Sequence, residues 1–111
     1  MENINIDDFA KIEIKIGQII EAEKLEASNK LLKLKVDFGN DDIRQVLSGI
    51  AKWYSAEDMI GKKFAFVTNL EPRKILDYES QAMILASHDQ IIDVVSILTP
   101  DKDVGPGSKV N

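Results

Sequence analysis

Apolar and polar residues alternate along the first third of the chain, which predicts strands that each bury one face. Residues 11–16 alternate three charged residues with three isoleucines, and this period of two is typical of a half-buried strand. Gly17 in this run indicates a bend or bulge, beyond which residues 18–23 continue the strand. Residues 32–38 alternate in the same way, and the turn residues Gly39-Asn40-Asp41-Asp42 lead into a third predicted strand at residues 43–47.

Two short helices are expected outside these strands. Asn5 or Asp7 caps a single turn that continues to residue 10, and Phe9 is predicted to point inward. Ser55 with Asp58 three residues later resembles a capping box, so a second short helix is expected before the glycine at position 61.

The segment between Asn69 and Met83 interrupts the alternation. Residues 62–67 predict a fourth strand, and Pro72 ends it because proline has no N–H to give to a neighbouring strand. Pro72 also suits the second position of a turn, so Arg73 and Lys74 are predicted at the tip of a loop, with a returning strand at residues 83–86. Two interpretations stay open, namely an ordinary hairpin with solvated cations and a cationic binding loop.

Composition places the chain among folded single domains. Its 111 residues fit one domain, and 44% hydrophobic with 30% charged residues favour a globular core. The absence of cysteine excludes a disulfide framework and a thiolate metal site. The N-terminal residues show no signal-peptide pattern, and no apolar run approaches the roughly 20 residues of a membrane span, so a cytoplasmic protein without membrane contact is expected.

The charge of the chain is unevenly distributed. Its net value of −5 disfavours nucleic acid, because phosphate binding rests on lysine and arginine. However, residues 1–29 carry −4, residues 30–74 carry +3 and residues 75–111 carry −4. A basic middle of this kind attracts a polyanion locally even when the whole molecule is anionic. The alternative is that these lysines only cover the solvent faces of strands.

The chain offers no catalytic constellation. It has a single histidine, His88, in a predicted turn, no cysteine and no glycine-rich phosphate loop. We therefore expect no catalytic residue, metal site or cofactor, and favour a binding protein over an enzyme. Trp53 and Tyr54 are candidates for stacking on bases, but aromatics beside a helix are more often lids on a core, and that interpretation is preferred.

Four stretches match, in order, the pattern of a known family. They are residues 8–17 (DFAKIEIKIG), residues 29–39 (NKLLKLKVDFG), residues 45–50 (QVLSGI), and the segment that begins NLEPRK at residue 69 and ends SQAM at residue 83. With these motifs the chain resembles the tRNA-binding domain found at the C-terminus of many methionyl-tRNA synthetases and as a stand-alone dimeric tRNA-binding protein. The resemblance implies an all-β fold: a five-stranded oligonucleotide-binding barrel with short helices at about residues 11–88, and a C-terminal dimerisation extension at about residues 89–111.

The resemblance also implies non-catalytic binding of tRNA by a homodimer, either alone or with a methionyl-tRNA synthetase catalytic chain as a further partner. The RNA-contacting positions of the family correspond to Lys30, Asn69, Arg73, Lys74, Ser80 and Met83. Relatives usually carry glycine where this chain has Tyr78 and Ala82, and Asp77 and Glu79 add negative charge to the loop. These departures keep open an alternative, a protein-binding member of the same fold family with an export-chaperone-like role.

Residues 91–98 are apolar on both faces of the strand that they predict, because hydrophobic residues occupy both alternating sets. One barrel covers only one of these faces, so a twofold partner is expected to cover the other. The predicted dimer interface comprises Ile91, Ile92, Val94, Val95, Ile97 and Leu98.

Overall fold

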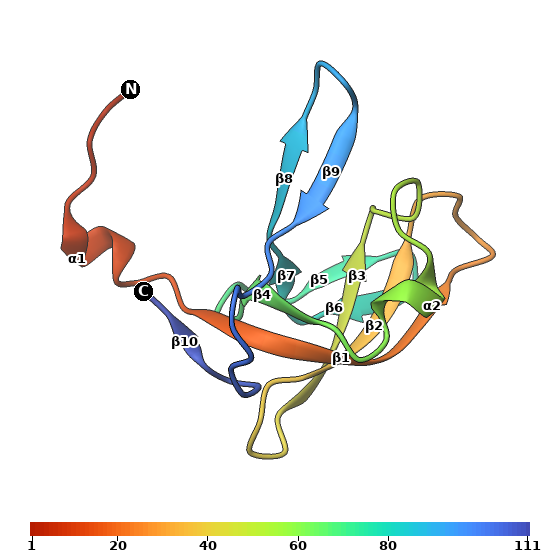
Figure 1. The fold of residues 1–111 in the computed structure, drawn as a ribbon, viewed down its shortest axis with the longest axis horizontal. Coiled ribbons are helices and arrows are strands. Elements are labelled where there is room, and N and C mark those ends of the chain that lie inside the picture. Colours follow the sequence, from red (N-terminus) through yellow and green to blue (C-terminus); the bar gives the residue numbers. More distant parts are fainter.

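The structure, a computed structural model, describes residues 1–111 and consists mainly of strands (Figure 1). Its helices are two single turns, α1 (Ile6–Phe9) and α2 (Ala56–Met59). The strands are β1 (Ile14–Lys24), β2 (Leu32–Asp37), β3 (Ile43–Ser48), β4 (Lys63–Val67), β5 (Arg73–Ile75), β6 (Tyr78–Ser80), β7 (Met83–Ile84), β8 (Ala86–Asp89), β9 (Val94–Ile97) and β10 (Lys109–Val110). Neither helix has the length and apolar character needed to cross a membrane.

Six strands form one antiparallel sheet in the order β3-β2-β1-β4-β7, with β10 paired to β1. The sheet curls into a nearly closed barrel (Figure 1). The long strand β1 is part of its wall and pairs with β2, β4 and β10. A shift in the pairing of β1 with β2, between Ile19 and Glu21, gives β1 the irregularity at which a strand bends. The predicted all-β fold with an oligonucleotide-binding type of barrel is confirmed.

The barrel closes between β3 and the residue that follows β6. The N–H of Gln81 donates to the carbonyl oxygen of Gln45 at 2.8 Å, and Gln81 Oε1 accepts from the Gln45 N–H at 2.9 Å. Inside lies a single core of 13 buried residues, to which β2 contributes Leu32, Leu34 and Val36. These are the apolar positions of the alternating pattern, so the predicted buried face of this strand is confirmed.

Gly17 allows β1 to lie close against the side chains that β2 directs into the core. A methyl group at this position would lie 2.5 Å from Val36 Cγ1 and 2.7 Å from Phe38 Cε1. A larger residue therefore fits only if the core shifts. The bend predicted at this glycine lies later, at the shift between Ile19 and Glu21.

The N-terminal segment lies apart from the barrel (Figure 1). Of the two predicted caps, Asn5 and not Asp7 caps α1, with its Oδ1 accepting from the Asp8 N–H at 2.8 Å; Ser55 caps α2 as predicted. The prediction that Phe9 points inward is wrong: its side chain is 38% exposed, and no residue of α1 is buried. The first strand also starts at Ile14 rather than at residue 11, because the chain still turns after α1.

Strands β8 and β9 form a separate hairpin that projects from the barrel (Figure 1). The returning strand predicted at residues 83–86 is split at Leu85 between β7 and β8. The strand predicted at residues 91–98 is shorter than expected, because Ile91 and Ile92 lie in the turn. Their N–H groups donate to Asp89 Oδ1 at 3.1 and 3.4 Å, so an aspartate side chain stabilises a turn inside the apolar run.

The β8–β9 hairpin is attached to the chain that precedes α2. Val95 and Ile97 of β9 pack on the barrel core. Tyr54 Oη accepts from the Ile97 N–H at 3.0 Å, and Trp53 Nε1 donates to the carbonyl oxygen of Asp93 at 3.0 Å. Tyr54 also packs against the core, as the lid interpretation predicts.

Candidate nucleic-acid interface

The segment between Asn69 and Met83 forms a two-stranded hairpin, β5–β6, beside β3. The paired positions are Arg73 with Ser80, Lys74 with Glu79, and Ile75 with Tyr78. The prediction that Arg73 and Lys74 occupy a loop tip is wrong. The chain becomes extended again after Pro72 and turns at Leu76, whose φ is 55°.

Arg73 and Lys74 remain fully available to a ligand. Both side chains are exposed, and neither takes part in an ion pair. Glu79 lies opposite Lys74 in the hairpin without bonding to it. Because successive side chains of a strand point to opposite faces, β5 carries one free positive charge on each face.

Lys30 lies at the same end of the barrel as the hairpin. It belongs to the connection before β2, whose first residue, Leu32, pairs with Ser48 at the end of β3. Ser80 is bonded to Leu47, the neighbour of Ser48, through its hydroxyl group. Lys30 is exposed and has no ion-pair partner. The fold thus brings the three predicted cations to one end of β3.

Asn69 and Ser80 stand at the two ends of the hairpin and bond to the barrel. Asn69 Oδ1 accepts from the Glu13 N–H at 2.8 Å, and its Nδ2 donates to the carbonyl oxygen of Lys11 at 2.7 Å. The Ser80 hydroxyl accepts from the Leu47 N–H at 3.0 Å and donates to the carbonyl oxygen of Ala82 at 3.1 Å. Of the two, Asn69 is exposed and Ser80 is buried.

Met83 contributes an apolar surface beside the cations. Its side chain is 46% exposed and lines a cavity of about 100 Å³ with Leu47, Leu70 and Ile75. Arg73 lies at the same cavity. An apolar wall next to an arginine suits a flat, partly polar group such as an unstacked base.

Arg44 is a basic residue of the central region that holds the protein together instead of remaining free. Its Nε and Nη2 each donate to the Asp42 carboxylate at 3.0 Å. Its Nη1 donates to the carbonyl oxygen of Thr68 at 2.6 Å and, more weakly, to that of Gln81 at 3.4 Å. Arg44 therefore joins the two ends of the hairpin, and its charge is already paired.

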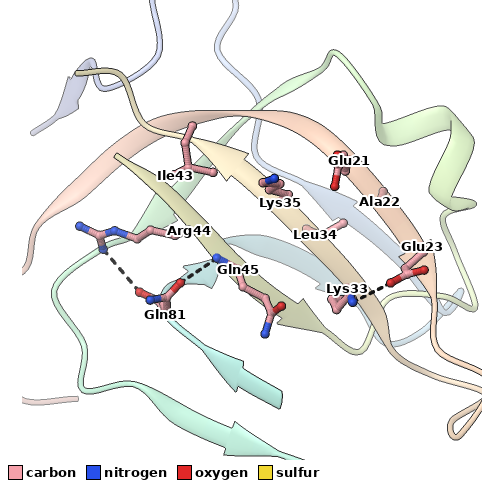
Figure 2. Close-up of a pocket in the computed structure, with 10 residues that line it drawn as sticks. All are labelled: Glu21, Ala22, Glu23, Lys33, Leu34, Lys35, Ile43, Arg44, Gln45 and Gln81. Carbon is pink, nitrogen blue, oxygen red and sulfur yellow. Dashed lines mark hydrogen bonds and ion pairs between the residues drawn. The ribbon is translucent and has the colours of Figure 1, made fainter. Parts of the chain in front are cut away.

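A groove of about 580 Å³ lies over β1, β2 and β3 (Figure 2). It is lined by Glu21, Ala22, Glu23, Lys33, Leu34, Lys35, Ile43, Arg44, Gln45 and Gln81. Lys33 Nζ pairs with Glu23 at 2.7 Å, and this bond raises the pKa of Lys33. Lys35 forms no ion pair, although Glu21 lies opposite it in the pairing of β1 with β2 and lines the same groove. The groove could not be predicted from the sequence, because it depends on how neighbouring strands pair.

Tyr78 and Ala82 replace the glycines of the family pattern without backbone strain. Neither has a positive φ, so these positions do not need glycine for conformational reasons. Ala82 is buried in the core, whereas the Tyr78 ring lies 4.9 Å from Lys33 Nζ, at the edge of the groove. No three His, Asp or Glu side chains are grouped in a way that could hold a metal ion.

A small β-barrel of this type, with an exposed hairpin that carries Arg73 and Lys74 beside a groove, is an architecture found among oligonucleotide-binding proteins. Residues 14–109 match the family model described as "Putative tRNA binding domain", and the chain belongs to this family. It is 45% identical over 111 residues to the methionine–tRNA ligase of Caldanaerobacter subterraneus subsp. tengcongensis. The match covers 100% of this chain but only 17% of the ligase.

Two solved structures have the same fold along the whole chain. The first is a MetRS-related protein from Pyrococcus horikoshii, with a TM-score of 0.92 and 38% identity, covering 99% of each chain. The second is the chaperone CsaA from Bacillus anthracis, with a TM-score of 0.88 and 27% identity, covering 99% of this chain and 100% of the other. Members with this fold thus include both a synthetase-related protein and a chaperone.

Proposed function

We propose that this chain binds tRNA without catalysing a reaction, as a stand-alone protein or as the tRNA-binding part of a methionyl-tRNA synthetase. The observation that carries the proposal is the β5–β6 hairpin, where Arg73 and Lys74 are exposed without ion-pair partners. Membership of the tRNA-binding family supports the same class of ligand. In this proposal residues 1–111 act as one domain, with the barrel at about 11–88 and the extension at about 89–111.

Recognition rests on phosphate contacts and on shape. Lys30, Arg73 and Lys74 bind phosphates, because their charges are free and lie at one end of the barrel. Met83 and the cavity beside it receive an unstacked nucleotide, since proteins that bind single-stranded RNA place bases against apolar or aromatic surfaces. Lys35 adds a further cation without an ion pair in the adjoining groove.

A gel-shift titration of mixed tRNA, duplex RNA and single-stranded DNA at one fixed salt concentration tests this proposal. We expect tRNA to bind more tightly than either competitor, because only tRNA offers both a folded shape and unpaired loops. Equal and weak binding to all three nucleic acids would contradict it.

We also propose that the chain forms a homodimer. The β8–β9 hairpin exposes an apolar surface in which Ile91 is 96% and Ile92 is 67% exposed, joined by Val94 and Leu98. Apolar side chains grouped in this way mark contact surfaces, and a twofold partner is the commonest occupant. Of the six predicted interface residues, Val95 and Ile97 pack on their own barrel and so orient this surface. A dimer also carries two β5–β6 hairpins, which raises affinity for a large ligand.

Sedimentation at micromolar concentration tests the dimer. Ile91→Asp combined with Ile92→Asp should give a folded monomer, because both side chains are exposed in the single chain. Ile60→Asp is the matched control, since Ile60 is 50% exposed and lies outside the β8–β9 hairpin. An unaltered chain that sediments as a monomer would refute the proposal.

A protein-binding, chaperone-like role is the alternative, and the likeness to CsaA favours it. In that role the apolar surface of the β8–β9 hairpin would contact a polypeptide. Salt separates the two functions: binding that relies on phosphate weakens as salt rises, whereas apolar binding stays constant or strengthens.

A further inference from the structure

Asn69 fastens the entry of the β5–β6 hairpin to the segment that leads into β1. Its Oδ1 accepts from the Glu13 N–H at 2.8 Å, and its Nδ2 donates to the Lys11 carbonyl oxygen at 2.7 Å. One partner is a donor and the other an acceptor, so the orientation of the amide group follows from its partners. The preceding residue strengthens the attachment, because the Thr68 N–H donates to the Glu13 carbonyl oxygen at 2.8 Å.

Ser80 fastens the exit of the hairpin to β3. It is only 6% exposed, and its hydroxyl hydrogen is used by the Ala82 carbonyl oxygen at 3.1 Å. The oxygen accepts from the Leu47 N–H at 3.0 Å, and so satisfies a backbone donor of β3 where the barrel closes. A nucleotide that accepted a hydrogen bond from this buried hydroxyl would have to displace the Ala82 carbonyl oxygen, because the group has only one hydrogen to donate.

Arg44 links the two attachments. Its guanidinium donates to the carbonyl oxygens of Thr68 and Gln81, which precede Asn69 and follow Ser80. The carboxylate of Asp42 holds the same guanidinium in place with two bonds. The hairpin is therefore held at both ends by side chains whose polar atoms are engaged within the protein.

We propose that Asn69 and Ser80 are positioning residues that hold the hairpin in a fixed geometry, and that neither touches the RNA. The proposal rests on the proposed tRNA binding. In it, Arg73 and Lys74 contact the RNA, whereas Asn69 and Ser80 only hold the hairpin against the barrel. A hairpin that is already ordered in the free protein binds without the cost of ordering it.

Hydrogen exchange of the free protein tests whether Asn69 and Ser80 hold the hairpin in place. Asn69→Ala should accelerate exchange of the Glu13 amide, and Ser80→Ala that of the Leu47 amide, each by about fivefold or more for one lost bond. Both variants should also exchange faster in β5 and β6. Asn29→Ala and Ser87→Ala are matched controls, because these exposed residues make no side-chain hydrogen bond, and they should exchange like the unaltered chain.

Titration of mixed tRNA tests the division of roles. Asn69→Ala and Ser80→Ala should weaken binding without changing its salt dependence, because no cation is removed. Ser80→Thr should restore binding, since it keeps the hydroxyl and the adjoining cavity gives room for the methyl group. If Ser80→Ala does not unfold cooperatively, the Asn69 variant carries the test, since its site is exposed.

Two results have opposite meanings. Weaker tRNA binding by Asn69→Ala and Ser80→Ala with unchanged exchange in the free protein would overturn the proposal, because the two side chains would then be direct contacts. If the unaltered chain binds no tRNA, the proposed function fails, but faster exchange in the free variants still shows that the two residues hold the hairpin in place.

Discussion

Replacing Arg73 and Lys74 together by alanine should weaken tRNA binding mainly by removing salt-sensitive contacts. Both side chains are exposed and unpaired in the free protein, so stability should change by less than about 0.5 kcal/mol. Each phosphate contact contributes about 0.7 to the slope of log affinity against log salt for a single strand, so two contacts contribute about 1.4. Between about 50 and 200 mM salt, the variant should therefore lose about sevenfold less affinity than the unaltered chain.

The assay is a binding titration with mixed tRNA at several salt concentrations. Lys62→Ala combined with Lys102→Ala is the matched control: it removes the same charge, and both lysines are exposed, unpaired and outside the hairpin. Its salt slope should stay close to that of the unaltered chain. If the control loses the same slope, or the hairpin variant loses none, overall charge rather than the hairpin governs binding and the reasoning fails.

Three further predictions concern single positions. Gly17→Ala should destabilise the chain by about 1–3 kcal/mol because the added methyl group overlaps side chains of the core. An unchanged midpoint of urea unfolding would contradict this, because it would mean that the core accommodates the methyl group. Asp93 has a lowered pKa, first through its hydrogen bond with Lys52 and then through His88, so these bonds should persist at neutral pH and weaken below about pH 4. Hydrogen exchange at the β8–β9 turn measures this loss, and Asp93→Asn should remove its pH dependence. Tyr78→Gly should not tighten tRNA binding, because the tyrosine has no positive φ to relieve; tighter binding in a gel shift would mean that the ring blocks the ligand.

The strands could be predicted from sequence where the signal is local. The alternation at residues 32–38 and the turn at residues 39–42 depend only on near neighbours, and both were predicted correctly. Phe9 could not be placed, because whether a single helical turn packs inward depends on distant parts of the chain. The turn at Ile91 and Ile92 was missed, since the apolar pattern hides the effect of the Asp89 side chain.

The cations of the site could be predicted as exposed, but not their individual roles. Arg44 and Asp42 are only two residues apart in the sequence, so their pairing had a local signal. The bonds from Arg44 to Thr68 and from Ser80 to Leu47 had none, because they join residues that meet only in the folded chain. The family pattern gave the residues of the hairpin without saying which of them face a ligand.

The pairing of charges shows which cations a chain of net charge −5 leaves free for a polyanion. Of the basic residues in the central region, Lys33, Arg44, Lys52 and Lys63 each have a carboxylate partner. Those that remain free are Lys30, Lys35, Lys62, Arg73 and Lys74. Two of these five, Arg73 and Lys74, lie in the β5–β6 hairpin, which also carries the carboxylates of Asp77 and Glu79. The potential that a polyanion meets there depends on this local arrangement rather than on the total charge.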